Sequence, residues 1–236
     1  MKLHLPPRYD LPEPEEPERD LPYGLGYSSV YDQRDRFHLM SSLAIPEPTR
    51  RWRYWTPGPA MDQGNTPQCV GYTVSQWGYT SPIRTKILDP TAIYHRAQQI
   101  DEWPGTDYDG TSVRAGLNVM REQGRVERYV WAYGADMLAR WLLTTGPVMV
   151  GTLWTWDMFE PDQNGIVHPT GPIVGGHAYL VTGVNRDRGE RGMFRAMNSW
   201  GNDWGWNGRF WILWEDMEYL LWNWGEAAAA IERKID

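Results

Sequence analysis

The only cysteine of the 236-residue chain, Cys69, is the first candidate for chemistry. The preceding Thr66-Pro67 predicts a helix start, with Thr66 as N-cap and Pro67 as the first helical residue. Free backbone N–H groups and the positive end of the helix dipole favour a thiolate in the first turn. The glycine-bearing turn Asp62-Gln63-Gly64-Asn65 just before it adds to this reactive setting. A buried core cysteine is the alternative interpretation.

A nucleophilic thiol needs a base, and His177 is the best placed of the five histidines. It follows Gly175-Gly176 and opens an apolar run, so we expect it at a strand edge facing a cleft. A half-buried strand histidine is the alternative. The other four are in segments that suggest no such role: His4 in the N-terminal tail, His38 in a loop, His95 within a helix and His168 before a proline.

The segment Asn198-Ser199-Trp200-Gly201-Asn202-Asp203-Trp204-Gly205-Trp206-Asn207-Gly208 combines turn-forming glycines with flat apolar rings. By composition alone it could be a structural aromatic loop. Its pattern, N-S-W-G-x-x-W-G-x-x-G, closely resembles the asparagine segment of papain-like (C1 family) cysteine peptidases.

Further motifs resemble that family in the same order and span about residues 52–214. They are Gln63-Gly64-Asn65-Thr66-Pro67-Gln68-Cys69, Asp109-Gly110-Thr111, Gly146-Pro147-Val148, Gly165-Ile166 and Gly175-Gly176-His177-Ala178. The chain lacks the disulfide cysteine usually found beside the nucleophile and has Gly176 before the histidine. Of the family's glycine pair only Gly110 matches. These departures resemble the disulfide-free bacterial, archaeal and phage branch.

The resemblance implies a Cys-His-Asn site that hydrolyses peptide bonds through an acyl-enzyme. Cys69 would supply the thiolate, with His177 as its imidazolium partner and proton donor to the leaving amine. Asn198 would orient the imidazole, and Trp200 would shield that contact. Gln63 would donate to the oxyanion beside the backbone N–H of Cys69. Gly110 would line the substrate cleft, and no metal or organic cofactor is implied.

Helical patterns come first along the chain and strand patterns second. Helices are predicted from Thr66, from Pro90 after Asp89, over 112–123 and over 135–143, and strands over 148–153, 178–184, 193–197 and 209–214. This order predicts an α+β protein with the papain-like two-subdomain fold: a helical part, an antiparallel β-barrel-like part and a cleft between them. We expect an extension over 1–45 and a peptidase domain over 46–236, divided into a helical part (46–134) and a β-rich part (135–236).

Composition limits the partners and the compartment. The formal net charge of −7 argues against nucleic acid or an anionic membrane as partner. No apolar run reaches the roughly 18 residues of a membrane span, and the N-terminal residues contain no apolar signal core. One cysteine excludes an internal disulfide. We therefore expect a cytoplasmic protein that acts on peptides or proteins, with a phage or virion setting left open.

Residues 1–45 have a different composition. Six prolines in the first 22 residues and the acidic stretch Glu13–Glu18 exclude a long helix there. Tyr23, Tyr27, Tyr31 and Phe37 could pack on a surface. We therefore expect an arm that docks on the protein itself or on a partner, outside the cleft; an inhibitory pro-segment is the alternative.

Two other functions remain open from the sequence. One is a catalytically silent papain-like scaffold that serves binding or assembly, which covalent labelling of Cys69 by a peptidyl epoxide would test. The other is a cell-wall peptide amidase, whose sugar platforms would come from Trp154, Trp156, Trp206, Trp211 and Trp214. Core packing is the simpler interpretation for most of these tryptophans.

Overall fold

The computed structural model describes residues 20–30, 32–83, 85 and 89–233. The helices in these residues are α1 (Cys69–Tyr79), α2 (Pro90–Ile100), α3 (Val113–Glu122), α4 (Ala135–Thr144) and α5 (Trp214–Trp222), with short 3₁₀ turns η1 (Gln33–Phe37), η2 (Met40–Ser42) and η3 (Trp156–Phe159). The strands are β1 (Trp52–Tyr54), β2 (Val126–Trp131), β3 (Val148–Thr155), β4 (Ile173–Asn185), β5 (Met193–Met197), β6 (Arg209–Leu213) and β7 (Glu226–Glu232).

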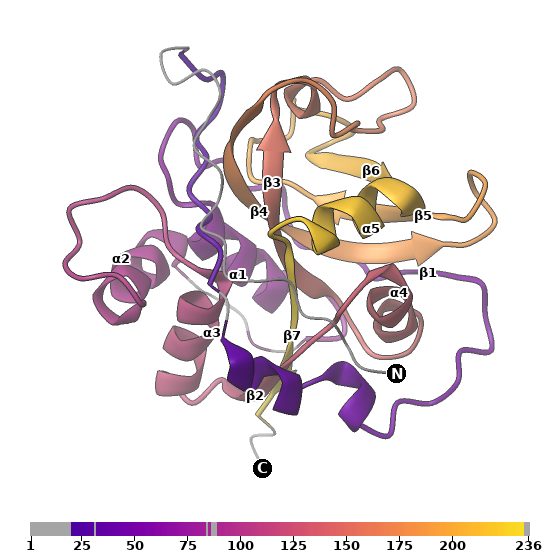
Figure 1. Ribbon diagram of the computed structural model, residues 1–236, viewed down its shortest axis with the longest axis horizontal. Coiled ribbons are helices and arrows are strands. Elements are labelled where there is room, and N and C mark those ends of the chain that lie inside the picture. The colour runs from indigo at the N-terminus through magenta and orange to yellow at the C-terminus, as the bar shows by residue number, and fades with distance from the viewer. Residues whose placement is uncertain (1–19, 31, 84, 86–88, 234–236) are drawn as a thin grey trace.

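The described strands form one antiparallel sheet in the order β2-β7-β3-β4-β5-β6, with β1 paired to β4. The predicted α+β class is confirmed, although the sheet is open rather than a closed barrel. Figure 1 shows α1, α2 and α3 grouped to one side of the long strands, with α4 and α5 on the other. The predicted boundary between a helical and a β-rich part stays a prediction.

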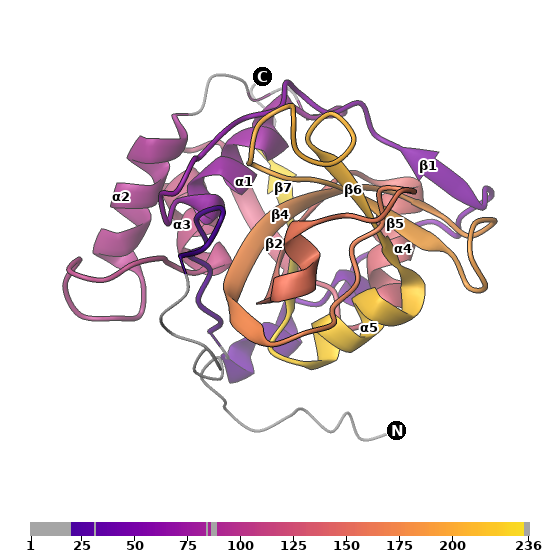
Figure 2. The same cartoon turned by 90° about the horizontal axis from the view of Figure 1, so that it is seen from above.

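The sheet separates two apolar cores because successive strand residues point to opposite faces. On β3, Val148 and Val150 belong to the core under α4 and α5, whereas Met149 belongs to the core under α1 and α3. On β4, Tyr179 and Ala178 divide in the same way. Figure 2 shows from above that α1, α2 and α3 lie to one side of the long strands and α4 and α5 to the other. Any site at the border of the two cores can therefore draw side chains from both.

The helix ends follow their local chemistry in two of the predicted cases. The side chain of Asp89 accepts hydrogen bonds from the backbone of Thr91 and Ala92, and Pro90 is the first residue of α2. Ser112 caps α3 by accepting from Ala115 N. Gly124, with φ +67°, provides the left-handed residue after α3.

Two predicted boundaries are wrong. Helix α1 starts at Cys69 rather than near Thr66, because Thr66 and Pro67 lie in the turn that follows Gln63. Strand β4 starts at Ile173, so His177 lies inside it rather than opening it. The glycines before His177 do not break the strand because β3 pairs with them throughout.

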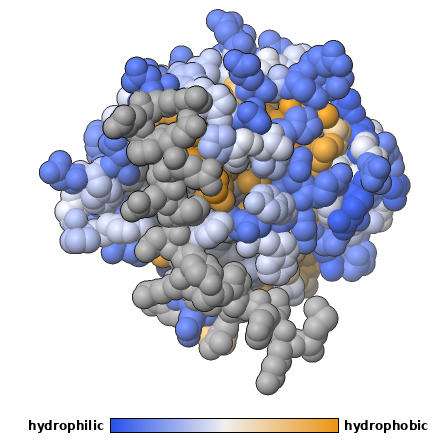
Figure 3. Space-filling model, turned by 45° about the horizontal axis from the view of Figure 1, so that its top comes forward, coloured by the Kyte–Doolittle hydropathy of each residue, from blue (hydrophilic) through white to orange (hydrophobic). Residues whose placement is uncertain are grey.

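The surface facing the reader in Figure 3 is mainly hydrophilic, with apolar colour confined to small areas. No helix among the described residues is long and apolar enough to cross a membrane.

We expect Asp89→Ala to lower the free energy of unfolding by about 1 kcal/mol, because the first backbone N–H groups of α2 lose their acceptor. Denaturant unfolding measures the change. Asp89→Asn is the matched control, since asparagine caps as well as aspartate and should keep most of the stability. Equal losses in both variants would contradict a capping role.

Candidate active site

Cys69 and His177 come together where α1 meets β4. Cys69 is the first residue of α1 and is fully buried. Its Sγ lies 3.4 Å from the backbone nitrogen of Ala178, which donates to it. Because Ala178 directly follows His177, the sulfur contacts the backbone next to the histidine.

Asn198 holds the imidazole of His177 from the other side. His177 Nε2 lies 2.7 Å from Asn198 Oδ1, and the backbone N–H of Ser199 donates to the same oxygen over 2.8 Å. An amide oxygen only accepts, so Nε2 carries the proton of the neutral ring. Nδ1 then has a free lone pair, and it has no hydrogen-bond partner among the described residues. This tautomer leaves Nδ1 able to take a proton from a neighbouring group.

Aromatic rings enclose this contact. The ring of Trp200 stacks on His177 with centroids 4.5 Å apart, and Trp154 meets it edge-on at 4.9 Å. Trp200 therefore lies where the sequence placed it, over the His177–Asn198 pair. The enclosure excludes water and strengthens the hydrogen bond between them.

Gln63 presents a fixed amide group near the same place. Its Oε1 accepts from Ser199 Oγ over 2.6 Å, which points Nε2 the opposite way. Nε2 donates to the carbonyl oxygens of Thr66 and Gly24, at 2.7 and 3.0 Å. The Gly24 oxygen also accepts from Trp200 Nε1 over 3.2 Å. The Gly24 carbonyl of the N-terminal arm thus accepts the hydrogen bond that Gln63 was expected to donate to an oxyanion.

The arm continues through the cleft as an extended chain. The backbone N–H groups of Gly26 and Tyr27 donate to the carbonyl of Gly176, each over 3.0 Å. Thr111 N donates to Gly26 O, and Ser28 N donates to Thr111 O, both over 3.0 Å. In Figures 1 and 2 this indigo segment lies between the helical group and β4. Gly110 lies beside it, since a Cβ there would come within 2.6 Å of Gly26 O.

The expectation that the arm stays out of the cleft is therefore wrong. A Cβ at Gly24 would collide with the backbone of Thr66, and one at Gly26 with the backbone of Pro67. Two glycines thus let an extended chain approach the cleft closely without a helix. The sequence signal was Gly24-Leu25-Gly26-Tyr27, which our sequence analysis did not use. Of the other aromatic residues expected to pack, Phe37 is exposed and Tyr31 lies outside the described residues.

Tyr27 anchors the arm in a buried pocket. Its ring is almost fully buried, and Gly151 of β3 leaves the room for it, because a Cβ there would overlap the ring. The hydroxyl donates to the carbonyl of Trp224 over 3.3 Å. Glu226 accepts from Val30 N over 3.2 Å, and burial raises the pKa of its carboxyl to about 8.

A buried ion pair fixes the next stretch of the arm. The Arg114 guanidinium of α3 pairs with both carboxylate oxygens of Asp35 in η1. Such a fork-to-fork pair also fixes geometry. Replacing either partner with a neutral residue would lower the stability of the fold, because the remaining charge would stay buried without a partner.

With the arm in place, the thiol and the imidazole favour their neutral forms. Burial raises the pKa of Cys69 to about 12 and lowers that of His177 to about 4. Both shifts have the same cause, because removal from water penalises the charged form of each group. The expected thiolate–imidazolium pair therefore does not describe this closed form.

The other histidines do not reach the site, and the tryptophans proposed as sugar platforms differ in their exposure. His95 is exposed on α2, and His168 lies 3.4 Å from the Asp162 carboxylate; His4 is outside the described residues. Trp154 and Trp214 are core residues, whereas Trp206 is 59% exposed. Within the described parts of the chain, no group of three or more His, Cys, Asp or Glu side chains could hold a metal ion.

Solved structures of similar fold include cysteine proteases and their precursors, which confirms the predicted papain-like fold. Xylellain, a cysteine protease from Xylella fastidiosa, is 18% identical with a TM-score of 0.63, over 93% of this chain and 99% of that one. Procathepsin L 3 of Tenebrio molitor larval midgut is 14% identical with a TM-score of 0.58, over 87% and 83%. Procathepsin B S9 from Trypanosoma congolense is 12% identical with a TM-score of 0.59, over 89% and 87%. Identities this low show the fold alone.

The sequence itself also matches a known family. The profile of the papain family of cysteine proteases matches residues 92–220, which include His177 and Asn198 but begin after Gln63 and Cys69. No curated protein matches the chain significantly. The chain belongs to the papain family of cysteine proteases and is a peptidase of the hydrolase class.

We expect Tyr27→Ala to make Cys69 far more reactive toward iodoacetamide. Loss of a buried aromatic ring costs about 3 kcal/mol, so the open fraction and the alkylation rate should rise roughly a hundredfold. The wild-type rate should still increase above pH 9, because the buried thiol, with its pKa of about 12, ionises only at high pH.

Tyr219→Ala is the matched control, since that tyrosine is 54% exposed on α5 and away from the arm. It should leave the alkylation rate unchanged. Equal rates for wild type and Tyr27→Ala would contradict an arm that limits access to the thiol.

Proposed function

We propose that the protein is a thiol-dependent peptidase that hydrolyses peptide bonds through an acyl-enzyme on Cys69. The observation that carries the proposal is the placement of three groups: Cys69 Sγ contacts the backbone N–H next to His177, and His177 is hydrogen-bonded to Asn198 with Nδ1 left free. A base beside a nucleophile, itself oriented by a third group, is the general arrangement for covalent catalysis.

In the open form, hydration returns both groups toward their ordinary pKa values, and proton transfer from Sγ to Nδ1 gives the attacking thiolate. The sulfur adds to the substrate carbonyl carbon, and the carbonyl oxygen becomes an oxyanion. Gln63 Nε2 and the backbone N–H of Cys69 stabilise that charge. The carbon–nitrogen bond then breaks as His177 delivers its proton to the amine.

Hydrolysis completes the cycle. His177 takes a proton from water, the hydroxide adds to the thioester carbon, and the carboxylic acid product leaves as Sγ is released. Asn198 suits the orienting role because a neutral amide does not compete with the thiolate for the imidazolium. Trp200 excludes water from the hydrogen bond between Asn198 and His177. Because the thiol must stay reduced, this chemistry fits the expected cytoplasmic setting.

The arm acts as an inhibitor of the same site in this proposal. The Gly24 carbonyl accepts from Gln63 in place of an oxyanion, and Gly26 pairs with Thr111 where a substrate backbone would pair. Release of the arm is then the step that permits catalysis. This revises the docking-arm expectation in favour of its pro-segment alternative.

Cys69→Ala and His177→Ala should each reduce hydrolysis of casein and of an internally quenched peptide to less than about one thousandth of wild type. Circular dichroism should show that both variants keep the fold. A Cys69→Ala variant with activity above that limit would exclude Cys69 as nucleophile. If the protein is instead a silent scaffold, neither the wild type nor the Tyr27→Ala protein should hydrolyse these substrates.

Gln63→Ala should lower kcat about 10²–10³-fold while KM changes little, because an oxyanion donor acts in the transition state. Both the Gln63 enzyme and the Gln63→Ala variant carry Tyr27→Ala, so that the arm is already released in each and loss of the Gln63–Gly24 contact does not affect the comparison. Ser199→Ala, which removes only the hydrogen bond that orients Gln63, should cost less. A change confined to KM would make Gln63 a binding residue.

A further inference from the structure

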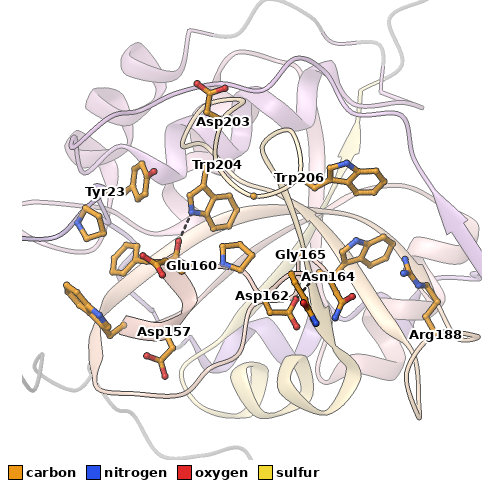
Figure 4. Close-up of a pocket in the computed structure, with 17 residues that line it drawn as sticks. Tyr23, Asp157, Glu160, Asp162, Asn164, Gly165, Arg188, Asp203, Trp204 and Trp206 are labelled. Carbon is orange, nitrogen blue, oxygen red and sulfur yellow. Dashed lines mark hydrogen bonds between the residues drawn. The ribbon is translucent and has the colours of Figure 1, made fainter.

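A large groove lies along one side of the β-rich part, with Tyr23 of the arm among its lining residues. Its volume is about 1110 Å³, and it lies between residues 156–165 and the loop 203–206. In Figure 4, Tyr23 of the arm lies at one end, Arg188 at the other, and Trp204 and Trp206 along one wall.

The groove connects to the catalytic groups through aromatic rings. The ring of Tyr23 stacks on Trp200 with centroids 4.7 Å apart. Trp200 in turn stacks on the imidazole of His177, with centroids 4.5 Å apart. Trp204 meets Trp200 edge-on at 5.1 Å, and its indole N–H donates to Phe159 O over 2.8 Å. The Tyr23 end of the groove is therefore built of packed rings that reach the imidazole through Trp200.

The charge of the lining is strongly negative. Arg188 is the one lining cation in the described residues, against the carboxylates of Asp157, Glu160, Asp162 and Asp203. Asp162 already accepts from the backbone of its own loop, and Asp157 accepts from Thr170. Glu160 and Asp203 are exposed, and no hydrogen bond or ion pair joins either carboxylate to a described residue.

We propose that this groove binds the part of a peptide substrate that follows the scissile bond, and that Glu160 and Asp203 select lysine or arginine side chains there. The inference rests on the proposed peptidase function. It adds a preference for positive charge on the leaving-group side of the bond.

The position of His177 determines which side of the substrate enters the groove. A leaving amine must lie against the imidazole that protonates it, and Trp200 covers that imidazole on the groove side. The acyl part stays on Cys69, beside the backbone groups of Thr111 and Gly176 that pair with the arm. The residues after the broken bond therefore extend past Trp200 into the groove.

A peptide fits the groove better than a sugar chain. Pro22 and Tyr23 already place polypeptide at one end of it. Trp204 and Trp211 are buried, so Trp206 is the tryptophan that exposes most of its ring for stacking on a sugar. Two unpaired carboxylates match cationic side chains, which extended lysine and arginine supply.

Binding can be measured with the arm in place, because the groove is open in this structure. The full chain carrying Cys69→Ala, labelled with ¹⁵N, is titrated with Ala-Lys-Lys-Ala, Ala-Gln-Gln-Ala, Ala-Glu-Glu-Ala and tetra-N-acetylglucosamine. The indole N–H resonance of Trp206 reports on the groove, and that of exposed Trp52 serves as reference. We expect the lysine peptide to shift Trp206 and to bind about fivefold more tightly than the glutamine peptide at low salt.

Glu160→Gln with Asp203→Asn should remove that preference. Glu127→Gln, an exposed acid on β2 at the far end of the sheet, is the matched control and should keep it. Equal binding of the lysine and glutamine peptides, or a Trp206 shift only with the sugar, would overturn the inference.

A kinetic comparison separates this inference from the proposed function. Tyr27→Ala enzyme is given quenched peptides with a lysine pair either before or after the cleaved bond, and kcat/KM should be about fivefold higher for the second. Cleavage that depends on Cys69 but not on the lysine position would overturn the inference alone. Lysine-peptide binding without Cys69-dependent cleavage would overturn both the peptidase proposal and the assignment of the groove to its substrate.

Discussion

The hydrogen bond from Gln63 Nε2 to the Gly24 carbonyl is the contact around which the closed site is arranged. Ser199 fixes the amide of Gln63, and Ser199 N–H also fixes the oxygen of Asn198 that holds His177. One serine thus links the oxyanion donor to the orientation of the base. With Gly24 on that donor, residues 26–28 pair with Gly176 and Thr111, and the fully buried Cys69 and His177 lack the water that their charged forms would need.

The sheet makes this arrangement possible. Strand β4 directs the side chain of Ala178 toward the core that contains Cys69, and the backbone N–H of Ala178 contacts Cys69 Sγ next to His177. Helix α1 approaches from the helical side and Trp200 from the β-rich side. The arm then crosses the border, where it pairs with both Thr111 and Gly176.

Local chemistry in the sequence predicted the cap at Asp89 and the helix that begins after Ser112, and it singled out the candidate site residues, because those signals depend on a few neighbouring residues. Elements set by distant contacts were missed. Ala227–Ala230 favours helix by propensity but forms strand β7, since β2 and β3 supply its partners. Trp214–Trp222 was taken partly as strand, although Trp214, Met217 and Leu220 form the buried face of α5. The course of the arm through the cleft depends on Gly24 and Gly26 meeting the backbone of Thr66 and Pro67, and the two glycines alone do not indicate which distant segment they meet.

The central claim is that the arm and a substrate compete for the same backbone groups. Amide hydrogen exchange, read at Gly26, Tyr27 and Ser28 before and after Cys69 is capped by a peptidyl epoxide, tests it most directly. The account predicts that capping removes the protection of these three amides, because the inhibitor takes over Gly176 and Thr111, while amides of β2 stay protected. Complete capping of Cys69 with unchanged protection of Gly26–Ser28 would contradict it.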